Sequence, residues 1–184
     1  MLLNSRNNLF FFNFPRAFVP AKVIERYKPY LNRIPGNIIA EPIDFINYSV
    51  QGVDLPSVSY EPVRQIGKVG QERAYRSSIH PDETRSKEMT ITMQLLDGYI
   101  NYWMMLDIFD HYYDIKTKNV HIPDGVVLRI LDAEGQIIVS SAFTEVLFKE
   151  IGPLQMNFSN NAPDFSTFDC TFEYLDLETK VELG

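Results

Sequence analysis

The sequence contains a single cysteine, Cys170, so no disulfide can form within the chain. Its stability therefore does not depend on oxidation, which is typical of proteins that fold or assemble inside cells. Cys170 falls on the apolar side of an alternating segment. There we expect it to be buried as a small hydrophobic residue and not to act as a reactive thiol.

Basic residues are also scarce. The chain has 17 lysines and arginines against 24 acidic residues, which gives a formal net charge of −7. A dedicated nucleic-acid-binding domain normally carries a basic stripe, so this balance argues against that class of protein.

Long apolar runs are missing as well. A membrane-spanning helix needs about 20 consecutive apolar residues, whereas the run Leu9–Phe12 is ended by Asn13 and Pro15. The N-terminal residues show neither the long apolar region nor the small-residue cleavage site of a secretory signal, so we do not expect one.

Motifs of common catalytic and cofactor-binding sites are absent. The chain has no Gly-x-Gly-x-x-Gly, no P-loop and no His-Glu-x-x-His, and no serine or cysteine in a recognisable nucleophile setting. Gly67 and Gly70 flank Lys68 without a helical pattern after them, so a phosphate-binding loop is not expected there. The sequence therefore argues against an enzyme and predicts no cofactor and no resident metal.

Aromatic residues are plentiful, with 13 Phe and 10 Tyr among 184 residues, enough for the core of one domain. The clearest pattern is the alternation of apolar and polar residues near the C-terminus. It runs through Leu154, Met156 and Phe158, and again from Phe168 to Tyr174. This period of two predicts two strands, each buried on one face, with turn residues 160–166 between them.

Similar patterns predict further elements along the chain. Strands are expected at residues 9–14, 43–50, 57–66, 88–96, 126–131 and 136–151, the last with a break at Ser140–Ser141. A short helix is expected at 21–32, and the principal helix follows Asp97, its expected cap, and ends near Asp114. Residues 67–86 are expected to form a long polar loop, and loops of this length are usually functional or disordered. The expected fold is therefore mainly β with one principal α-helix, a β-sandwich or barrel.

The principal helix carries a polar set at positions i, i+3, i+4 and i+7, which lie on one face: Asp107, Asp110, His111 and Asp114. Carboxylates and imidazole are plausible metal ligands. The same spacing also describes the solvated side of an amphipathic helix, which is the interpretation we favour.

The order of elements resembles a known family. The run Val53-Asp54-Leu55-Pro56 is followed by the long polar loop, a strand and a helix with Tyr102-Trp103, and the chain closes with Gly152-Pro153-Leu154 and the alternating strands. This arrangement, from about residue 43 to 177, resembles the tail-tube proteins of tailed phages, especially contractile ones. The tube proteins of type VI secretion are similar in fold. The resemblance divides the chain into an extension, residues 1–42, and a tail-tube-like β domain, residues 43–184.

The resemblance implies a structural virion protein of the phage tail, assembled in the host cytoplasm. Six copies would form a ring, and stacked rings would form the tube through which DNA passes without specific binding. The implied partners are other copies of the chain and sheath, baseplate or tape-measure proteins, with no membrane.

Two groups of residues are assigned roles on this basis. Arg73, Arg76 and Arg85 of the long loop are expected to contact the next ring. Acidic residues at polar strand positions are expected to line the lumen, namely Glu145, Asp169 and Glu173.

Two alternatives stay open. Residues 15–42 depart from the expected tube pattern, which favours a tail hub, baseplate or tube-initiator ring of the same fold. An alternative of another class is a monomeric β-barrel that binds a small ligand or a metal.

Overall fold

The computed structural model describes residues 9–33, 41–57, 62–66, 72–75, 86–117, 120–154 and 166–182. These contain three α-helices, α1 (Ala21–Leu31), α2 (Pro42–Ser49) and α3 (Ile100–Tyr113), and two 3-10 turns, η1 (Arg16–Phe18) and η3 (Asp97–Tyr99). The strands are β1 (Phe10–Asn13), β2 (Val50–Asp54), β3 (Val63–Ile66), β4 (Glu72–Tyr75), β5 (Glu88–Gln94), β6 (Val126–Leu131), β7 (Ile137–Thr144), β8 (Leu147–Ile151), β9 (Thr167–Glu173) and β10 (Asp176–Val181).

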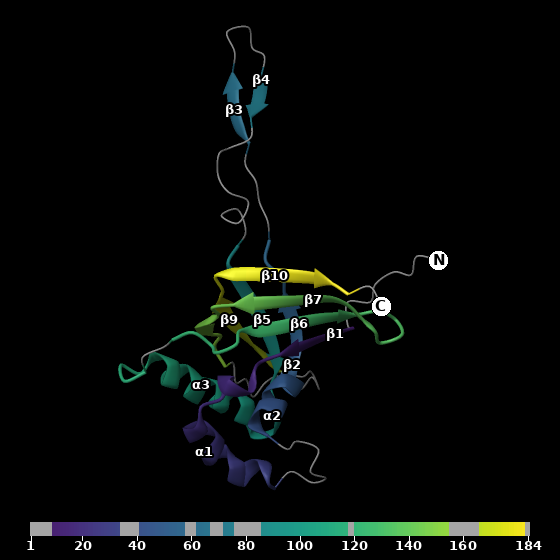
Figure 1. Ribbon diagram of the computed structural model, residues 1–184. Coiled ribbons are helices and arrows are strands. Elements are labelled where there is room, and N and C mark those ends of the chain that lie inside the picture. The colour runs from purple at the N-terminus through teal and green to yellow at the C-terminus, as the bar shows by residue number, and fades with distance from the viewer. Residues whose placement is uncertain are drawn as a thin grey trace, which may run out of the picture.

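Two antiparallel sheets of four strands form the body, in the orders β1-β6-β7-β10 and β2-β5-β9-β8. In Figure 1 the strands of one sheet cross those of the other, and the helices gather at one end of the body. A third sheet, the hairpin β3–β4, stands away from the opposite end. The mainly-β fold expected from the sequence is confirmed.

The core lies between the two large sheets and follows the alternation of the sequence. Met89, Ile91 and Met93 of β5 are buried, and Phe168, Cys170 and Phe172 of β9 lie beside them in the ladder. Burial raises the pKa of the Cys170 thiol, which keeps the group protonated and unreactive. The expected role of Cys170 as a buried small residue is confirmed.

The N-terminal segment contributes directly to this core. β1 pairs with β6, with Phe10 opposite Ile130, and Phe14 stacks on Phe18 at 4.4 Å between ring centroids. Phe18 also lies 6.2 Å from the ring of Phe148 in the second sheet. Residues 10–18 thus share one set of aromatic contacts with both sheets.

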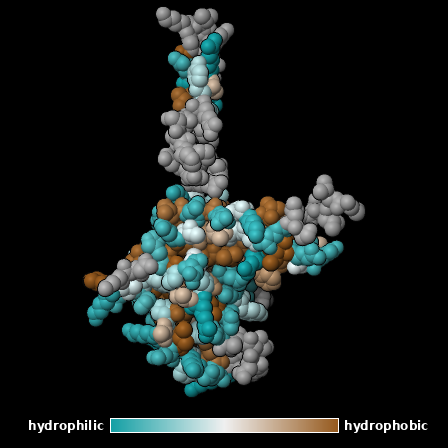
Figure 2. Space-filling view, viewed as in Figure 1, coloured by the Kyte–Doolittle hydropathy of each residue, from teal (hydrophilic) through white to brown (hydrophobic). Residues whose placement is uncertain are grey.

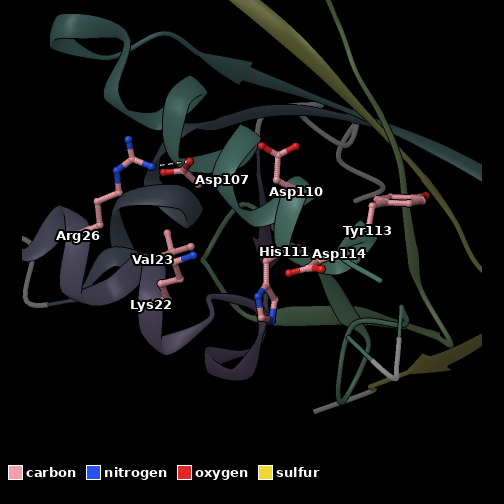
Figure 3. A pocket seen from close by; sticks show the side chains of 8 residues that line it. All are labelled: Lys22, Val23, Arg26, Asp107, Asp110, His111, Tyr113 and Asp114. Carbon is pink, nitrogen blue, oxygen red and sulfur yellow. Dashed lines mark hydrogen bonds and ion pairs between the residues drawn. The ribbon is translucent and has the colours of Figure 1, made fainter. Parts of the chain in front are cut away.

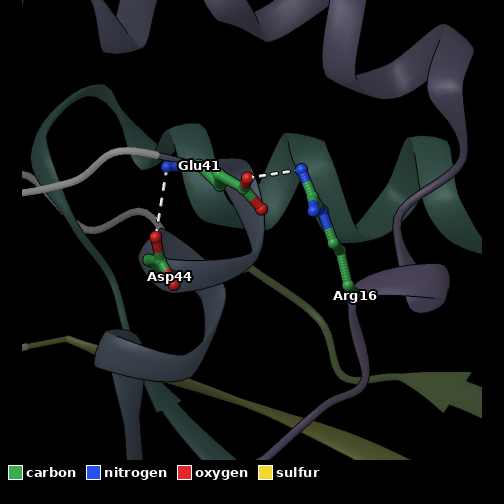
Figure 4. A network of polar contacts seen from close by, with 3 residues as sticks. All are labelled: Arg16, Glu41 and Asp44. Atoms are coloured by element: carbon green, nitrogen blue, oxygen red, sulfur yellow. Dashed lines mark hydrogen bonds and ion pairs between the residues drawn. The ribbon is translucent and has the colours of Figure 1, made fainter.

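The strand expected at residues 43–50 is wrong, because Pro42–Ser49 is helix α2. A capping box begins it: the Glu41 side chain accepts from the backbone of Asp44, and Asp44 Oδ2 accepts from Glu41 N at 3.1 Å. Arg16 adds an ion pair of 2.5 Å to Glu41 (Figure 4). Pro42 at the first helical position completes the start signal.

The predicted helix at residues 21–32 is confirmed as α1, which continues two residues beyond Pro29. The principal helix, α3, ends where expected, but Asp97 does not cap it. Instead the buried side chain of Asn101, in the first turn, fixes the chain that leads into α3. Its Oδ1 accepts a hydrogen bond from Leu96 N at 3.1 Å, and its Nδ2 donates one to Gln94 O at 2.6 Å. Within the residues that the structure describes, no helix is long and apolar enough to cross a membrane.

Several strand boundaries differ from the expectation. Strand β2 begins where the expected strand 43–50 ends, with a bulge between Val50 and Gly52, and β4 lies within the expected loop 67–86. The break in residues 136–151 falls at Glu145, which has φ of 49°, and not at Ser140–Ser141. Strand β10, which has little alternation in burial, was not expected.

The expected strand pair near the C-terminus is half correct. Its second arm is β9, but the strand beside β9 on that side of the sheet is β8. Leu154 lies outside any strand, and Met156 and Phe158 fall outside the described residues. Gly152 N donates to Asp169 O at 2.7 Å, so backbone pairing with β9 continues one residue beyond β8.

A tight turn before β6 offers a test of the fold. Gly125 has φ of +64°, and a Cβ there would lie 2.0 Å from the carbonyl oxygen of Phe143. We expect Gly125→Ala to lower the free energy of unfolding by about 3 kcal/mol or more, from clash and left-handed strain together.

Gly135→Ala is the matched control, because φ is +84° there but nothing lies within 4 Å of the added carbon. It should cost only about 1 kcal/mol of left-handed strain. Equal losses in chemical denaturation of the two variants would contradict the close approach at Gly125.

Candidate functional site: surfaces for assembly

The outer face of the β2-β5-β9-β8 sheet is polar across all four strands. One row of the ladder joins Asp54, Thr90, Thr171 and Glu150, one residue from each strand. The alternation that buries every second residue of β5 and β9 places the polar residues on this opposite face. It consists mostly of threonines and carboxylates.

Asp169 and Glu173 both lie on this face, on strand β9. Asp169 Oδ1 accepts a hydrogen bond of 2.8 Å from Thr92 Oγ1, and Glu173 lies directly opposite Glu88. Like charges opposite each other in a ladder are destabilising. Lys149 pairs with Glu88 and relieves part of this repulsion.

The pKa of Lys149 reports the negative character of the face. The hydrogen bond to Glu88 raises this pKa, and the charges of Glu88, Glu173 and Glu150 raise it further. The alternation that indicated Asp169 could also have indicated Glu88. The sequence does not indicate Asp54, because β2 begins only at Val50, where the expected strand 43–50 ends. It does not indicate Glu150, because a bulge shifts the register of β8.

Glu145 does not belong to this face. It occupies the turn between β7 and β8, with positive φ, and its carbonyl oxygen lies 3.2 Å from His121 Nδ1. The expectation that it is an alternate residue of a strand is wrong, because the long strand breaks at this residue.

The four-stranded sheet with the acidic face has two outer strands, β2 and β8. All its neighbouring strands are antiparallel, so β2 and β8 run in opposite directions. A second copy placed beside the first can therefore set its β2 against β8 in antiparallel order. Outer strands present unpaired N–H and C=O groups, and such edges are templates for pairing with another chain.

The edge at β8 is partly occupied within the subunit. His121 forms a bridge with Leu147, and the Tyr113 hydroxyl donates to Phe148 O at 2.6 Å. These contacts come from the segment that follows α3 and from α3 itself. Neither contact reaches the part of β8 from Lys149 to Ile151, which is the part we consider for pairing with a neighbouring strand.

The hairpin β3–β4 forms a second candidate surface. Its strands pair from Val63 opposite Tyr75 to Ile66 opposite Glu72, and Figure 2 shows apolar atoms exposed on it. An isolated two-stranded hairpin is at best marginally stable in water. Ser86 N donates to Ser57 O at 2.9 Å, so the segment leaves and rejoins the body at adjacent points.

Of the three arginines expected to contact a neighbouring ring, Arg73 lies on β4, exposed and opposite Gln65. Arg76 and Arg85 fall outside the described residues. The structure therefore locates one of the three arginines, Arg73, on the hairpin. The role of all three in a contact between rings stays a prediction.

The polar set on α3 lines a groove of about 480 Å³ between α1 and α3 (Figure 3). Asp107 already has two partners there. It accepts a hydrogen bond of 2.7 Å from the Tyr27 hydroxyl and one of 2.8 Å from Arg26. Burial and this hydrogen bond raise the pKa of Tyr27. Figure 3 shows the groups spread along the helix, and the described residues contain no group of three ligands suited to a metal ion.

Comparison with solved structures identifies the architecture. The chain superposes on a chain of the extended sheath–tube complex of the extracellular contractile injection system PVC with a TM-score of 0.54 and 9% identity, covering 97% of this chain and 93% of that one. A chain of the tube-terminating cap of the anti-feeding prophage gives 0.56 at 6% identity, with 99% and 94% covered. A chain of the six-fold symmetrised anti-feeding prophage baseplate gives 0.56 at 12% identity, with 98% of each covered.

No protein-family model and no curated protein sequence matches the chain. At such low identity the likeness to solved structures establishes the fold and nothing further. The chain has the tail-tube-like fold found in components of contractile injection systems.

Proposed function

We propose that the protein is a structural subunit of a phage tail or related injection tube, in which six copies form a ring and rings stack into a tube. The observation that carries this is the pair of antiparallel outer strands, β2 and β8, on one sheet. Joining β8 of each copy to β2 of the next closes the sheets into one barrel and removes both edges.

The acidic face supports passage of DNA through such a ring. If the β2-β5-β9-β8 sheet forms the barrel, its outer face, with Asp169 and Glu173, becomes the inner wall. Six copies at −7 each give a ring a formal charge of −42. A wall of carboxylates and hydroxyls repels phosphates, and its described residues offer no aromatic platform on which bases stack.

The hairpin β3–β4 supports stacking of rings. It stands away from the body in Figure 1, and its exposed apolar residues gain stability only from a partner surface. Arg73, Arg76 and Arg85 would meet acidic residues of the adjoining ring. Sheath, baseplate and tape-measure proteins are further partners of such an assembly in the virion.

A terminal ring of the same fold, such as a cap, hub or baseplate ring, is the second candidate. It is favoured by the equally good superposition on cap and baseplate chains. A terminal ring would assemble as single rings, whereas a main tube subunit would assemble as long tubes.

Assembly is directly measurable. We expect negative-stain microscopy and mass photometry of the purified protein to show rings of six copies, or tubes built from them. A monomer that persists at every protein concentration would contradict the proposal and favour a ligand-binding β-barrel.

Removal of the hairpin should separate ring formation from stacking. Because Ser57 and Ser86 are hydrogen-bonded, residues 58–85 can be replaced by Asn-Gly, which favours a two-residue hairpin turn. We expect folded rings that no longer stack, as seen by microscopy. The charge reversal Arg73→Glu should weaken stacking without affecting ring mass. Tubes of normal length from the deletion variant would exclude the hairpin from the ring–ring contact.

The inner-wall assignment is testable by charge. Glu173→Lys should make assembled rings bind DNA, because lysines on the wall neutralise phosphates and release counterions. Binding should fall steeply as salt is raised. Glu134→Lys makes the same charge change in the exposed β6–β7 turn and should bind far less. Equal DNA binding by the two variants would show that Glu173 does not face the lumen.

A further inference from the structure

An uncharged groove lies beside the β2 edge. It has a volume of about 590 Å³ and is lined by β1 from Phe10 to Asn13 and by Asn47, Tyr48, Val50 and Gln51. Tyr48 is 74% exposed and Phe11 58% exposed. Natural edge strands are usually protected by charged residues, yet β1 carries none.

An apolar projection lies on the other side of the subunit, at the C-terminal end of α3. Ile115 is fully exposed, and Tyr113 before it is 47% exposed. Figure 2 shows an apolar tip at this end of α3. The turn has a defined shape, because Thr117 N donates to Asp114 O at 2.8 Å and Thr117 Oγ1 donates to His111 O at 2.7 Å. We name residues Tyr113–Lys116 the projection.

The projection and the groove lie beside opposite edges of the β2-β5-β9-β8 sheet. Tyr113 is bonded to Phe148 of β8, whereas Val50 and Gln51 of the groove belong to β2. Figure 1 shows the end of α3 and the β1–β2 side on opposite flanks of the body. A contact that sets β8 of one copy against β2 of the next therefore also brings the projection of the first toward the groove of the second.

We propose that the groove is occupied by Ile115 of the adjacent copy in the ring. This inference rests on the proposed ring. The contact is heterologous, because the two surfaces differ and lie on opposite flanks, and such contacts form closed rings when the rotation between copies closes. Phe11 and Tyr48 supply the apolar walls, and the charged neighbours Asp114 and Lys116 remain at the rim.

The contact between Ile115 and the groove adds to the interface that backbone pairing at β8 would form, which is short. That pairing involves only Lys149–Ile151 of β8, so ladder hydrogen bonds alone give a small interface. Net stabilisation per hydrogen bond is modest, since each replaces a bond to water, whereas burial of an isoleucine side chain adds the larger apolar contribution. Burial of Ile115 in the groove thus supplies most of the stability of the contact between copies, and the pairing of β8 with β2 sets how the two copies are aligned.

Cross-linking tests the juxtaposition. The full-length chain carries only the buried Cys170, so Ile115→Cys and Tyr48→Cys in one chain introduce the accessible thiols. With a short bismaleimide reagent we expect a ladder of covalent species reaching six copies on a denaturing gel. Each single-cysteine variant, and the pair Leu175→Cys with Tyr48→Cys, should give no ladder, because Leu175 is exposed between β9 and β10 and does not belong to the projection.

The outcomes separate this inference from the proposed function. Rings seen by microscopy without a ladder would overturn the contact and leave the ring proposal standing. Absence of rings from the unmodified chain would overturn both. Ladders from the Leu175 pair at equal yield would also overturn the contact, because they would report random collisions.

A second measurement does not depend on cross-linking chemistry. Ile115→Asp should raise the protein concentration needed for ring formation by roughly ten- to a hundredfold, the fold-change expected for loss of one buried isoleucine per contact. Since Ile115 is fully exposed in the subunit, the thermal unfolding midpoint of the monomer should not change. Ile115→Leu is the control and should assemble normally. Unchanged assembly of Ile115→Asp would overturn the contact.

Discussion

Unpaired backbone groups at the outer strands of the β2-β5-β9-β8 sheet are the constraint on which the rest of the structure depends. Each edge N–H and C=O must bond to water or to a strand, and an exposed flat edge invites pairing. Within the part of the chain that the structure describes, His121 and Tyr113 meet this need at part of β8. The antiparallel order of the four strands makes the remaining parts of the two edges compatible with each other.

The two faces of the β2-β5-β9-β8 sheet differ in composition and in their effect on stability. The inner face supplies the aromatic and aliphatic core, to which the N-terminal segment adds Phe14 and Phe18. The outer face concentrates carboxylates at a cost in stability, visible where Glu88 and Glu173 lie opposite each other. Lys149 offsets that cost locally without making the face basic. An exposed ion pair of this kind is screened by solvent and contributes little to stability, so its main effect is on the local field.

The sequence predicted the elements whose burial follows a simple period. β5 and β9 alternate cleanly, and α3 is long enough to be recognised by its apolar side. Residues 43–50 were misread because Ile46, Tyr48 and Val50 also alternate, and the stronger signal was the capping box at Glu41 and Asp44. β10 gave little signal, because five of its six residues are exposed and Leu177 alone among them is partly buried against the core. Of the outer-face residues, Asp169 and Glu173 followed from the alternation, whereas Asp54 and Glu150 did not. The sequence did not predict the groove, because it joins β1 to residues 47–51, whose proximity only the fold determines. It did not predict the projection, because only the fold places the end of α3 beside β8.

The hydrogen bond between Ser57 and Ser86 has a consequence for how this architecture diversifies. A segment that departs and returns at adjacent residues can change in length or sequence without altering the geometry beneath it. The entropy of closing such a loop rises only slowly with its length. The hairpin is thus an exchangeable module, and related chains could acquire arms of different reach or specificity on the same body. The same site offers a place for grafting a foreign peptide, displayed once per subunit, without disturbing the two sheets.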